Sequence, residues 1–291
     1  MIRIIPIYKI SITSIIHMLP YIGTLNLKSL TLNLLMSQAV IGLDVGGTKI
    51  SGIVWSNKTV VRELTAPTPK NKKDFHSAID RLVNLLSTGR TIKSIGLGIA
   101  GVVEGKTGKI KVSPNLRFLE RENIKQFVPF AKDKIFIDND ANCFSLAELQ
   151  LGKGKGFRDF IGITLGTGIG GGIVIDKKLY RGSHGSAGEV GHMMADLKND
   201  SEYYFQKARD KKDFEKVGKV LGVLFANIVN TLDVEALVLG GTVAITHHKQ
   251  FLPEALRVCK LHMINKTEMP KVIISSLKNA GAVGAALLCT E

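Results

Sequence analysis

IGLDVGGTKISGIVW (41–55) and IGITLGTGIGGGIVI (161–175), aligned without a gap, are identical at six of fifteen positions. Each begins with an apolar run, continues through a turn of Gly and Thr, and ends in a second apolar run. This pattern predicts a duplicated unit made of a strand, a tight turn and a second strand. Two such hairpins in one chain predict two similar lobes with something between them.

The rest of the chain predicts an alternation of strands and helices in both halves, which is typical of α/β domains with mixed sheets. Apolar spacing predicts a helix over 74–89, with Asp74 as its N-cap, and a long helix over 214–232. Further helices are expected at 141–152 and 280–288, and short apolar strands at 94–103, 134–138 and 236–244.

Composition favours an ordinary globular protein that binds small molecules. The 291 residues are 45% hydrophobic and 22% charged, and the net charge is +14. The lysines are scattered and form no basic stripe interleaved with aromatic residues, so we expect no nucleic-acid partner. Three cysteines far apart in the sequence fit a reducing compartment, and they include no C-x-x-C pair for zinc.

Residues 1–35 differ from the rest because they contain no acidic residue and are rich in Ile, Leu, Ser and Thr. The uncharged stretch 10–27 is long enough for a membrane span, but polar residues and Pro20 interrupt it. We interpret residues 1–35 as an appendage, disordered or a mis-assigned start, and expect no membrane partner. MSQAVIGLDVGG, from Met36, is a natural opening for the first strand.

The glycine-rich turns predict phosphate binding. GTGIGG (166–171) matches the dinucleotide fingerprint, but the residues that follow predict a strand where that fingerprint needs a helix. Gly105-Lys-Thr lacks the earlier glycine of a Walker loop and is interpreted as a turn. Main-chain N–H groups in a Gly/Thr hairpin turn form a concave anion site. Asp44, placed to hold Mg²⁺ directly or through water, and the Thr48 hydroxyl support this interpretation.

FIDNDAN (136–142) places four polar side chains where a strand should give way to a helix. Helix capping explains one of them, because Asp and Asn are preferred caps. Carboxyl ends of strands are where α/β clefts hold their chemistry. A carboxylate there would accept the proton of a hydroxyl that attacks a phosphoryl group.

Glu189 and His192 stand three residues apart in GSAGEVGHMMADLKND (185–200). His192 could be a metal ligand, but the residues that follow include no Cys or His. It could equally be a core histidine with its hydrogen bonds satisfied. The third interpretation is that both side chains bind a polyhydroxylated ligand, which needs such donors and acceptors.

Taken together and in order, seven motifs resemble those of the ROK family, whose members include repressors and sugar kinases within the actin-like, hexokinase-like ATPase fold. The motifs are GLDVGGTK, GIAGVVEG, SPNL, DNDAN, GTGIGGGIV, GSAGEVGH and LVLGGTVA, and the resemblance spans residues 40 to 290. It implies a two-lobed, ribonuclease H-like α/β fold with duplicated mixed sheets and a cleft between the lobes. The expected lobes are residues 36–138 with about 277–291, and residues 139–276.

The resemblance also implies roles for individual residues. It makes Asp140 the catalytic base, and it implies that ATP and Mg²⁺ are the cofactors. ATP would bind Asp44, Gly46, Gly47, Thr48, Lys49, Thr167, Gly168, Gly240 and Gly241. The sugar would bind Gly101, Asn115, Asn139, Asp140, Glu189, His192 and Glu202, the last in SEYYF (201–205).

Two departures from the family pattern affect these expectations. The G-x-P-G turn is Gly98-Ile-Ala-Gly101 here, without the proline that stiffens it. Many members bind structural zinc through the equivalent of His192 and a cysteine-rich segment, which this chain lacks between His192 and Glu202. We therefore expect no structural zinc, and packing of Met193, Met194 and Tyr203 to hold the loop. Some N-acetylmannosamine kinases of the family also lack the zinc module.

The expected function is an ATP-dependent kinase acting on the 6-hydroxyl of a hexose or N-acetylhexosamine, with N-acetylmannosamine slightly favoured over glucose. The resemblance further implies a cytoplasmic homodimer. One alternative is a sugar-responsive repressor, although 1–35 shows neither a helix-turn-helix pattern nor a basic recognition helix. Another is a non-catalytic sugar-binding protein, which the intact Asp44, Asp140 and Gly/Thr sets disfavour.

Overall fold

The computed structural model describes residues 39–290, and the appendage expected at 1–35 lies outside them. Two five-stranded sheets form the framework. The first, in the order β3-β2-β1-β4-β7, contains β1 (Ala39–Val45), β2 (Lys49–Ser56), β3 (Thr59–Pro67), β4 (Ile92–Ile99) and β7 (Ile135–Asn139). The second, in the order β10-β9-β8-β11-β12, contains β8 (Phe160–Leu165), β9 (Ile169–Ile175), β10 (Lys178–Tyr180), β11 (Ala236–Gly240) and β12 (Lys271–Ile274).

The two sheets are built in the same way. In each, three consecutive strands form an antiparallel meander, and two later strands add in parallel beside its first strand. The repeated segments 41–55 and 161–175 fall on β1–β2 and β8–β9. The predicted duplication is therefore a duplication of sheet topology.

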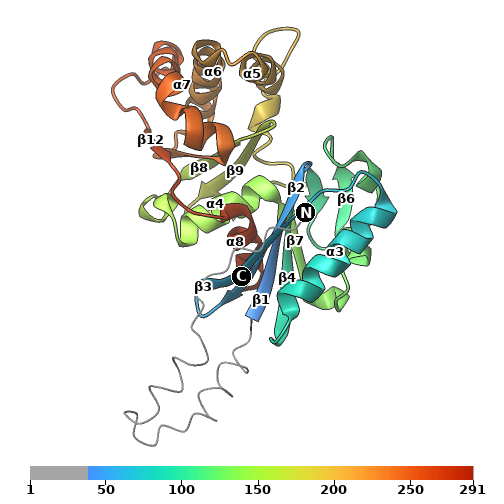
Figure 1. Ribbon diagram of the computed structural model, residues 1–291. Helices are drawn as coiled ribbons and strands as arrows, with labels where there is room; N and C mark the ends of the chain where they lie inside the picture. Colours follow the sequence, from blue (N-terminus) through green and yellow to red (C-terminus); the bar gives the residue numbers. More distant parts are fainter. Residues whose placement is uncertain (1–38, 291) are drawn as a thin grey trace, which may run out of the picture.

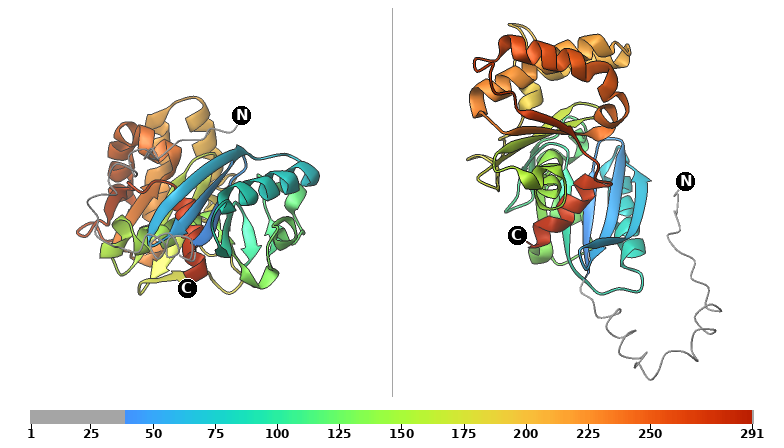
Figure 2. Two further views of the ribbon diagram at one scale, coloured as in Figure 1. Left: turned by 60° about the horizontal axis from the view of Figure 1, so that its bottom comes forward. Right: turned by 90° about the vertical axis from the view of Figure 1, so that its left-hand side faces the viewer.

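Helices cover both sheets and fill the space between them (Figure 1). The outer face of the first sheet carries α3 (Lys72–Ser87), and that of the second carries α5 (Ser201–Asp210), α6 (Phe214–Leu232) and α7 (Gly241–His262). Between the sheets lie α4 (Asp140–Gln150) and α8 (Ala280–Leu287), as both views in Figure 2 also show. α8 comes from the end of the described chain and returns to the first sheet.

Glycines allow α4 and α8 to pack very closely against the sheets, because no Cβ separates the two backbones there. A Cβ built on Gly96 of β4 would lie 1.7 Å from the carbonyl oxygen of Ala285 in α8. A Cβ built on Gly162 of β8 would lie 2.3 Å from the Ser145 hydroxyl in α4. The two helices also touch each other, since a Cβ on Gly284 would lie 1.7 Å from the carbonyl oxygen of Cys143. Gly162 belongs to the repeat, so the repeat's glycines are not confined to its turns but also serve helix packing.

Smaller elements complete the first lobe and the loops. The hairpin β5 (Val102–Glu104) and β6 (Lys109–Val112) reaches toward the second lobe, where the Lys111 ammonium donates to the carbonyl oxygen of His184 at 3.1 Å. Short 3₁₀ turns occur at Arg117–Leu119, Ile124–Phe127, Lys132–Lys134, Lys153–Gly156, Val190–His192 and Leu288–Thr290. Within residues 39–290, no helix has the length and apolar character needed to cross a membrane.

The predicted elements are present, with three differences. The cap of α3 is Asn71, whose side chain accepts from the Asp74 N–H at 2.9 Å, so Asp74 is not the cap. The strand expected at 94–103 is two strands, because the chain turns at Gly101 with a φ of +133°. The strand expected at 236–244 ends at Gly240, and α7 begins at once.

Candidate active site

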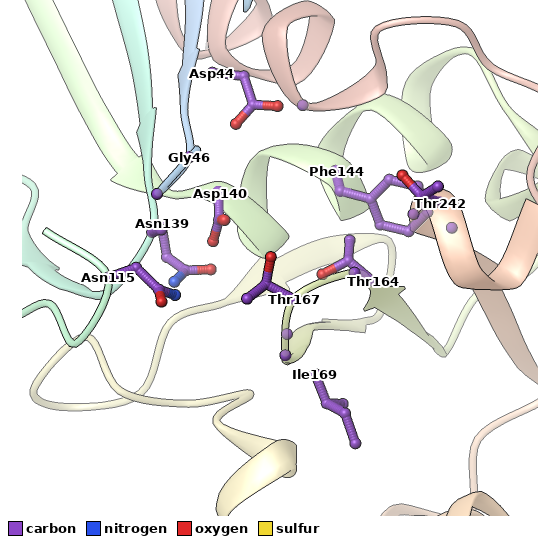
Figure 3. A pocket seen from close by; sticks show the side chains of 18 of the residues that line it. Asp44, Gly46, Asn115, Asn139, Asp140, Phe144, Thr164, Thr167, Ile169 and Thr242 are labelled. Carbon is purple, nitrogen blue, oxygen red and sulfur yellow. The ribbon is translucent and has the colours of Figure 1, made fainter. Parts of the chain in front are cut away.

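A cleft of about 440 Å³ lies between the two sheets and α4. Every residue predicted for the site lines it except Thr48, which is exposed but does not line the cleft. From the first lobe come Asp44, Gly46, Gly47, Lys49, Gly101, Asn115 and Asn139, and from α4 and the second lobe come Asp140, Thr167, Gly168, Glu189, His192, Glu202, Gly240 and Gly241. Figure 3 shows Asp44, Asp140 and Thr167 facing the same hollow.

The four polar side chains at 138–142 have different partners. Asp138 is buried, accepts from the Asn142 amide at 2.7 Å and pairs with Arg181 at 2.6 Å. Asn139 caps α4 by accepting from the N–H groups of Ala141 and Asn142 at 2.8 and 3.1 Å. The Asp140 carboxylate accepts from the adjacent Ala141 N–H at 2.9 Å. Its carboxylate is thus the one that the helix terminus leaves available to the cleft.

Two half-buried carboxylates, Asp44 and Asp140, line the cleft. Burial, reinforced by the charge of Asp140 and opposed by Lys49, raises the pKa of Asp44 to about 7. Burial also raises the pKa of Asp140 to about 6, against the Ala141 N–H bond. A divalent cation beside Asp44 would relieve this repulsion. Mg²⁺ is commonly held by one or two carboxylates together with substrate phosphates, so this pair suits it without a larger ligand cluster.

Hydrogen bonds from neighbouring residues fix the conformation of the first glycine turn. The Gly46 N–H donates to the Lys49 carbonyl at 3.1 Å, which closes the turn between β1 and β2. The Thr68 hydroxyl and the Lys70 ammonium bind the carbonyl oxygens of Gly46 and Gly47 at 2.7 and 2.5 Å. Gly46 and Gly47 line the cleft with their carbonyls bonded in this way, which suits an anion site built from backbone N–H groups.

The second glycine turn, between β8 and β9, faces the first. The Gly166 N–H donates to the Gly168 carbonyl at 3.0 Å. Thr167 stands at the tip with its hydroxyl toward Asp140 (Figure 3). Gly241, with a φ of +84°, lies where a Cβ would come within 2.5 Å of the Leu165 carbonyl oxygen, so only glycine fits beside this turn.

The polar groups expected to bind a sugar gather on the other side of Asp140. The Asn139 amide donates to the Gly101 carbonyl at 3.0 Å, which joins α4 to the turn after β4. Burial raises the pKa of Glu189, with His192 opposing and Glu202 reinforcing the shift. The Asp200 hydrogen bond, more than the nearby carboxylates, raises the pKa of His192. Glu189, His192 and Glu202 are therefore close enough to act on one ligand.

The loop from His192 to Asp200 is held by hydrogen bonds. His192 Nδ1 lies 2.9 Å from the Asp200 carboxylate, which also caps α5 at the Tyr203 N–H at 2.8 Å. Asp196 accepts from the N–H groups of Lys198 and Asn199 at 2.7 and 2.9 Å and from the Tyr204 hydroxyl.

The packing hypothesis for this loop is wrong in part. Met193 packs against the core, but Met194 is 56% exposed and Tyr203 is 38% exposed. Across residues 39–290, no group of three or more His, Cys, Asp or Glu side chains could hold a metal ion.

The cleft also contains residues that sequence reasoning missed. Thr242 and Ile245 on α7 lie at its far end, with Ser275 and Asn279 between β12 and α8. Gly281 lies where a Cβ would come within 2.5 Å of the Asp44 carboxylate. A neighbouring hollow of about 380 Å³ continues from Ile245 to Glu63. The small residues at 280–288 gave a packing signal, but nothing in their pattern pointed to the cleft.

Comparison with known proteins agrees with this architecture. The ROK family model matches residues 40–209 and 204–291. A glucokinase from Streptomyces coelicolor is 38% identical over 155 residues, 53% of this chain and 49% of the relative. This match spans about half the length of that glucokinase. An N-acetyl-D-glucosamine kinase from Mannheimia succiniciproducens is 27% identical over 304 residues, 85% of this chain and 98% of the relative.

The fold has a close counterpart among solved structures. A ROK family glucokinase from Streptomyces griseus, solved in complex with glucose and AMPPNP, aligns with a TM-score of 0.75 and 25% identity. The alignment covers 86% of this chain and 98% of that one. The duplicated sheets, the two facing glycine turns and the cleft between them define the class of actin-like ATPase folds. Within that class, the chain belongs to the ROK family.

Proposed function

We propose that this protein is an ATP- and Mg²⁺-dependent kinase that phosphorylates the 6-hydroxyl of a hexose or N-acetylhexosamine. The observation that carries the proposal is the position of Asp140. Its carboxylate is exposed to the cleft between the two glycine turns on one side and the polar set around Glu189 on the other. A base in this place can take a proton from a sugar hydroxyl that faces a bound phosphate.

The chain's own residues would act mainly by positioning and by charge. The two turns would hold the triphosphate through backbone N–H groups, with Lys49 and Thr167 at their rims. Asp44 would hold Mg²⁺, which neutralises phosphate charge when bound. Asn115, Glu189, His192 and Glu202 would orient the sugar so that its 6-hydroxyl meets Asp140. Because Asp140 has a pKa of about 6, it is ionised at neutral pH and can accept the proton.

The substrate class rests on two observations. The names of the relatives include glucokinase and N-acetyl-D-glucosamine kinase, which supports a hexose or an N-acetylhexosamine. The loop after His192 has hydrogen bonds where many family members have cysteines and zinc, and this favours N-acetylmannosamine slightly over glucose. Since the reaction uses ATP, we place it in the cytoplasm. A coupled ATP assay with glucose, mannose, N-acetylglucosamine and N-acetylmannosamine ranks the substrates by kcat/KM.

Substitution of the base tests the proposal directly. Asp140→Asn keeps the size of the side chain but cannot take a proton, so kcat should fall by roughly 10²–10⁴-fold or more. Sugar binding, measured by calorimetry, should survive. Asp133→Asn, the same chemical change at an exposed position just before β7, is the matched control and should behave as wild type. Turnover in Asp140→Asn comparable to wild type contradicts the assignment.

A further inference from the structure

The second glycine turn is bound by side chains of α5. Arg209, in the last turn of that helix, donates through Nη1 to the carbonyl oxygen of Gly166 at 2.9 Å and also to that of Thr167. One guanidinium thus binds two consecutive carbonyls of the turn proposed to hold phosphate. Neither residue type nor spacing in the sequence pointed to Arg209.

Arg209 is itself held in place. Its Nε and Nη2 donate to the Asp210 carboxylate at 2.9 and 2.6 Å. Its guanidinium carbon lies 5.8 Å from the centre of the Phe205 ring, and Phe205 is fully buried. Only 22% of the Arg209 side chain is exposed. A planar group fixed on three sides loses little further entropy when it binds the turn, which suits a positioning role.

The first turn of α5 binds the other side of the same glycine turn. Glu202 accepts from the Ile169 N–H at 2.7 Å, and a Cβ on Gly168 would come within 2.2 Å of its carboxylate. Glu202 also lines the cleft and raises the pKa values of Glu189 and His192 on the sugar side. Arg209 follows Glu202 by two helical turns, so both side chains leave the same face of α5.

These contacts determine which backbone groups of the turn remain free to bind a ligand. The carbonyls of Gly166 and Thr167 point back to Arg209, and the N–H groups of Gly166 and Ile169 are already bonded. Within the described part of the chain, the N–H groups of Thr167 and Gly168 are then the ones left for an anion. Successive N–H groups that face one hollow are the arrangement that binds phosphate.

We propose that Arg209 is a positioning residue for the phosphates of ATP, and that α5, through Glu202 and Arg209, couples sugar binding to ATP binding. This inference rests on the proposed kinase function. A sugar that engages Glu202 fixes the N-terminal end of α5 and the Ile169 side of the turn, while Arg209 fixes the Gly166 side. A coupling of this kind is reciprocal, so ATP should tighten sugar binding by the same factor.

The experiment compares Arg209→Gln with Lys207→Gln. Lys207 lies on the same helix and carries the same charge, but it binds the Tyr203 hydroxyl and not the turn. We expect Arg209→Gln to raise the KM for ATP roughly ten- to thirtyfold, from the loss of charged hydrogen bonds, and to lower kcat. The sugar dissociation constant without nucleotide should stay at the wild-type value. Lys207→Gln should change neither constant.

A binding measurement tests the coupling without turnover. The affinity for a non-hydrolysable ATP analogue is measured by calorimetry with and without saturating sugar. Sugar should tighten it by roughly 5- to 150-fold in the wild type and in Lys207→Gln. In Arg209→Gln the factor should fall toward one. Added guanidinium ion should restore part of the analogue affinity in Arg209→Ala but not alter the wild type.

Three results would overturn the inference. The first is wild-type ATP constants in Arg209→Gln, and the second is a sugar effect on analogue binding that survives the substitution. The third is an equal loss of sugar and ATP affinity with a lowered melting temperature, which would make Arg209 merely structural. A wild-type protein that binds the analogue but transfers no phosphate to any sugar contradicts the proposed function instead, and the two failures are thereby distinguished.

Discussion

Asp140 differs from its polar neighbours in what its side chain binds. Asp138 and Asn142 bind each other inside the protein, and Asn139 caps the helix. These contacts fix the first turn of α4 and therefore the position of the Asp140 backbone. Because Asn139 caps the helix, the Asp140 carboxylate is not needed as the cap. A cluster that resembles redundant capping is therefore three structural groups around the one carboxylate that we propose as the base.

Asp44 should weaken the empty protein at alkaline pH. Its pKa is 3.8 in an unfolded chain and about 7 when folded, so the folded state loses stability as the pH rises from about 4 to 7. Asp44→Asn removes the charge that must be buried. We expect the variant to be more stable than wild type by on the order of 1–3 kcal/mol at pH 8, with little difference near pH 4.

Urea unfolding without nucleotide or Mg²⁺ at several pH values measures this effect. Asp133→Asn, whose carboxyl is exposed, serves again as the control and should show no such trend. Destabilisation of Asp44→Asn at pH 8 would mean that the Asp44 carboxylate is compensated within the folded chain. The same substitution should abolish the Mg²⁺-dependent part of nucleotide binding.

His192 has an acidic partner, Asp200, at the position where the family resemblance raised the question of zinc. A zinc ion withdraws electrons from an imidazole, whereas the Asp200 carboxylate favours its protonated form and raises its pKa. The free ring nitrogen is then a stronger donor when His192 is protonated and an acceptor when it is not. The sugar contact that we propose for His192 would therefore depend on pH in a way that a contact made by a zinc-bound histidine would not.

At the scale of elements, the small residues of α8 set how closely the lobes pack. Gly96→Ala would place a methyl group 1.7 Å from the Ala285 carbonyl oxygen, a clash with backbone that side-chain rotation cannot relieve. We expect a loss of at least about 3 kcal/mol in the free energy of unfolding, at the upper end for overpacking. Denaturant titration of the ligand-free protein measures it.

Gly156→Ala is the matched control for this prediction. Nothing lies within 4 Å of a Cβ at Gly156, and its φ is not positive. The same chemical change there should leave stability within about 0.5 kcal/mol of wild type. Equal effects of the two substitutions would show that α8 can shift to make room.

The sequence predicts elements well where periodicity is strong. The α6 helix has the expected bounds, and the strand–turn–strand repeat falls on β1–β2 and β8–β9. The sequence could not indicate Arg209. Its neighbours in the sequence give no sign that its side chain contacts Gly166 and Thr167, far earlier in the chain. Ser275 and Asn279 were missed for the same reason. Their role comes from the path of the chain between the lobes.

At the scale of the whole molecule, the cleft exists because both lobes present equivalent turns. Gly46 and Gly47 follow β1, and Thr167 and Gly168 follow β8, so each sheet supplies one wall at the same point of its topology. A ligand with a chain of phosphates can therefore touch both sheets at once. The sequence repeat predicted this symmetry, but the distance between the turns depends on α4 and α8, which lie between the sheets.

The position of α8 makes the first lobe depend on residues far away in the chain. We predict that a chain ending at Asn279 will keep the second sheet protected in hydrogen exchange and lose protection in β1 and β4. Gly42 in β1 and Gly96 in β4 both lie against the backbone of α8. A chain that also retains α8 is the control. Protection of β1 and β4 in the shortened chain would contradict the prediction.

The contact between α8 and the first sheet also affects how the chain folds during synthesis. The ribosome produces the strands of the first sheet early, but the helix that covers their inner face is made only after all of the second lobe. During that interval the nascent sheet has one apolar face exposed, a state in which collapsed or chaperone-bound intermediates are expected. The lobe that begins to form first should therefore be the last to become native, and slowing translation should not hasten its completion.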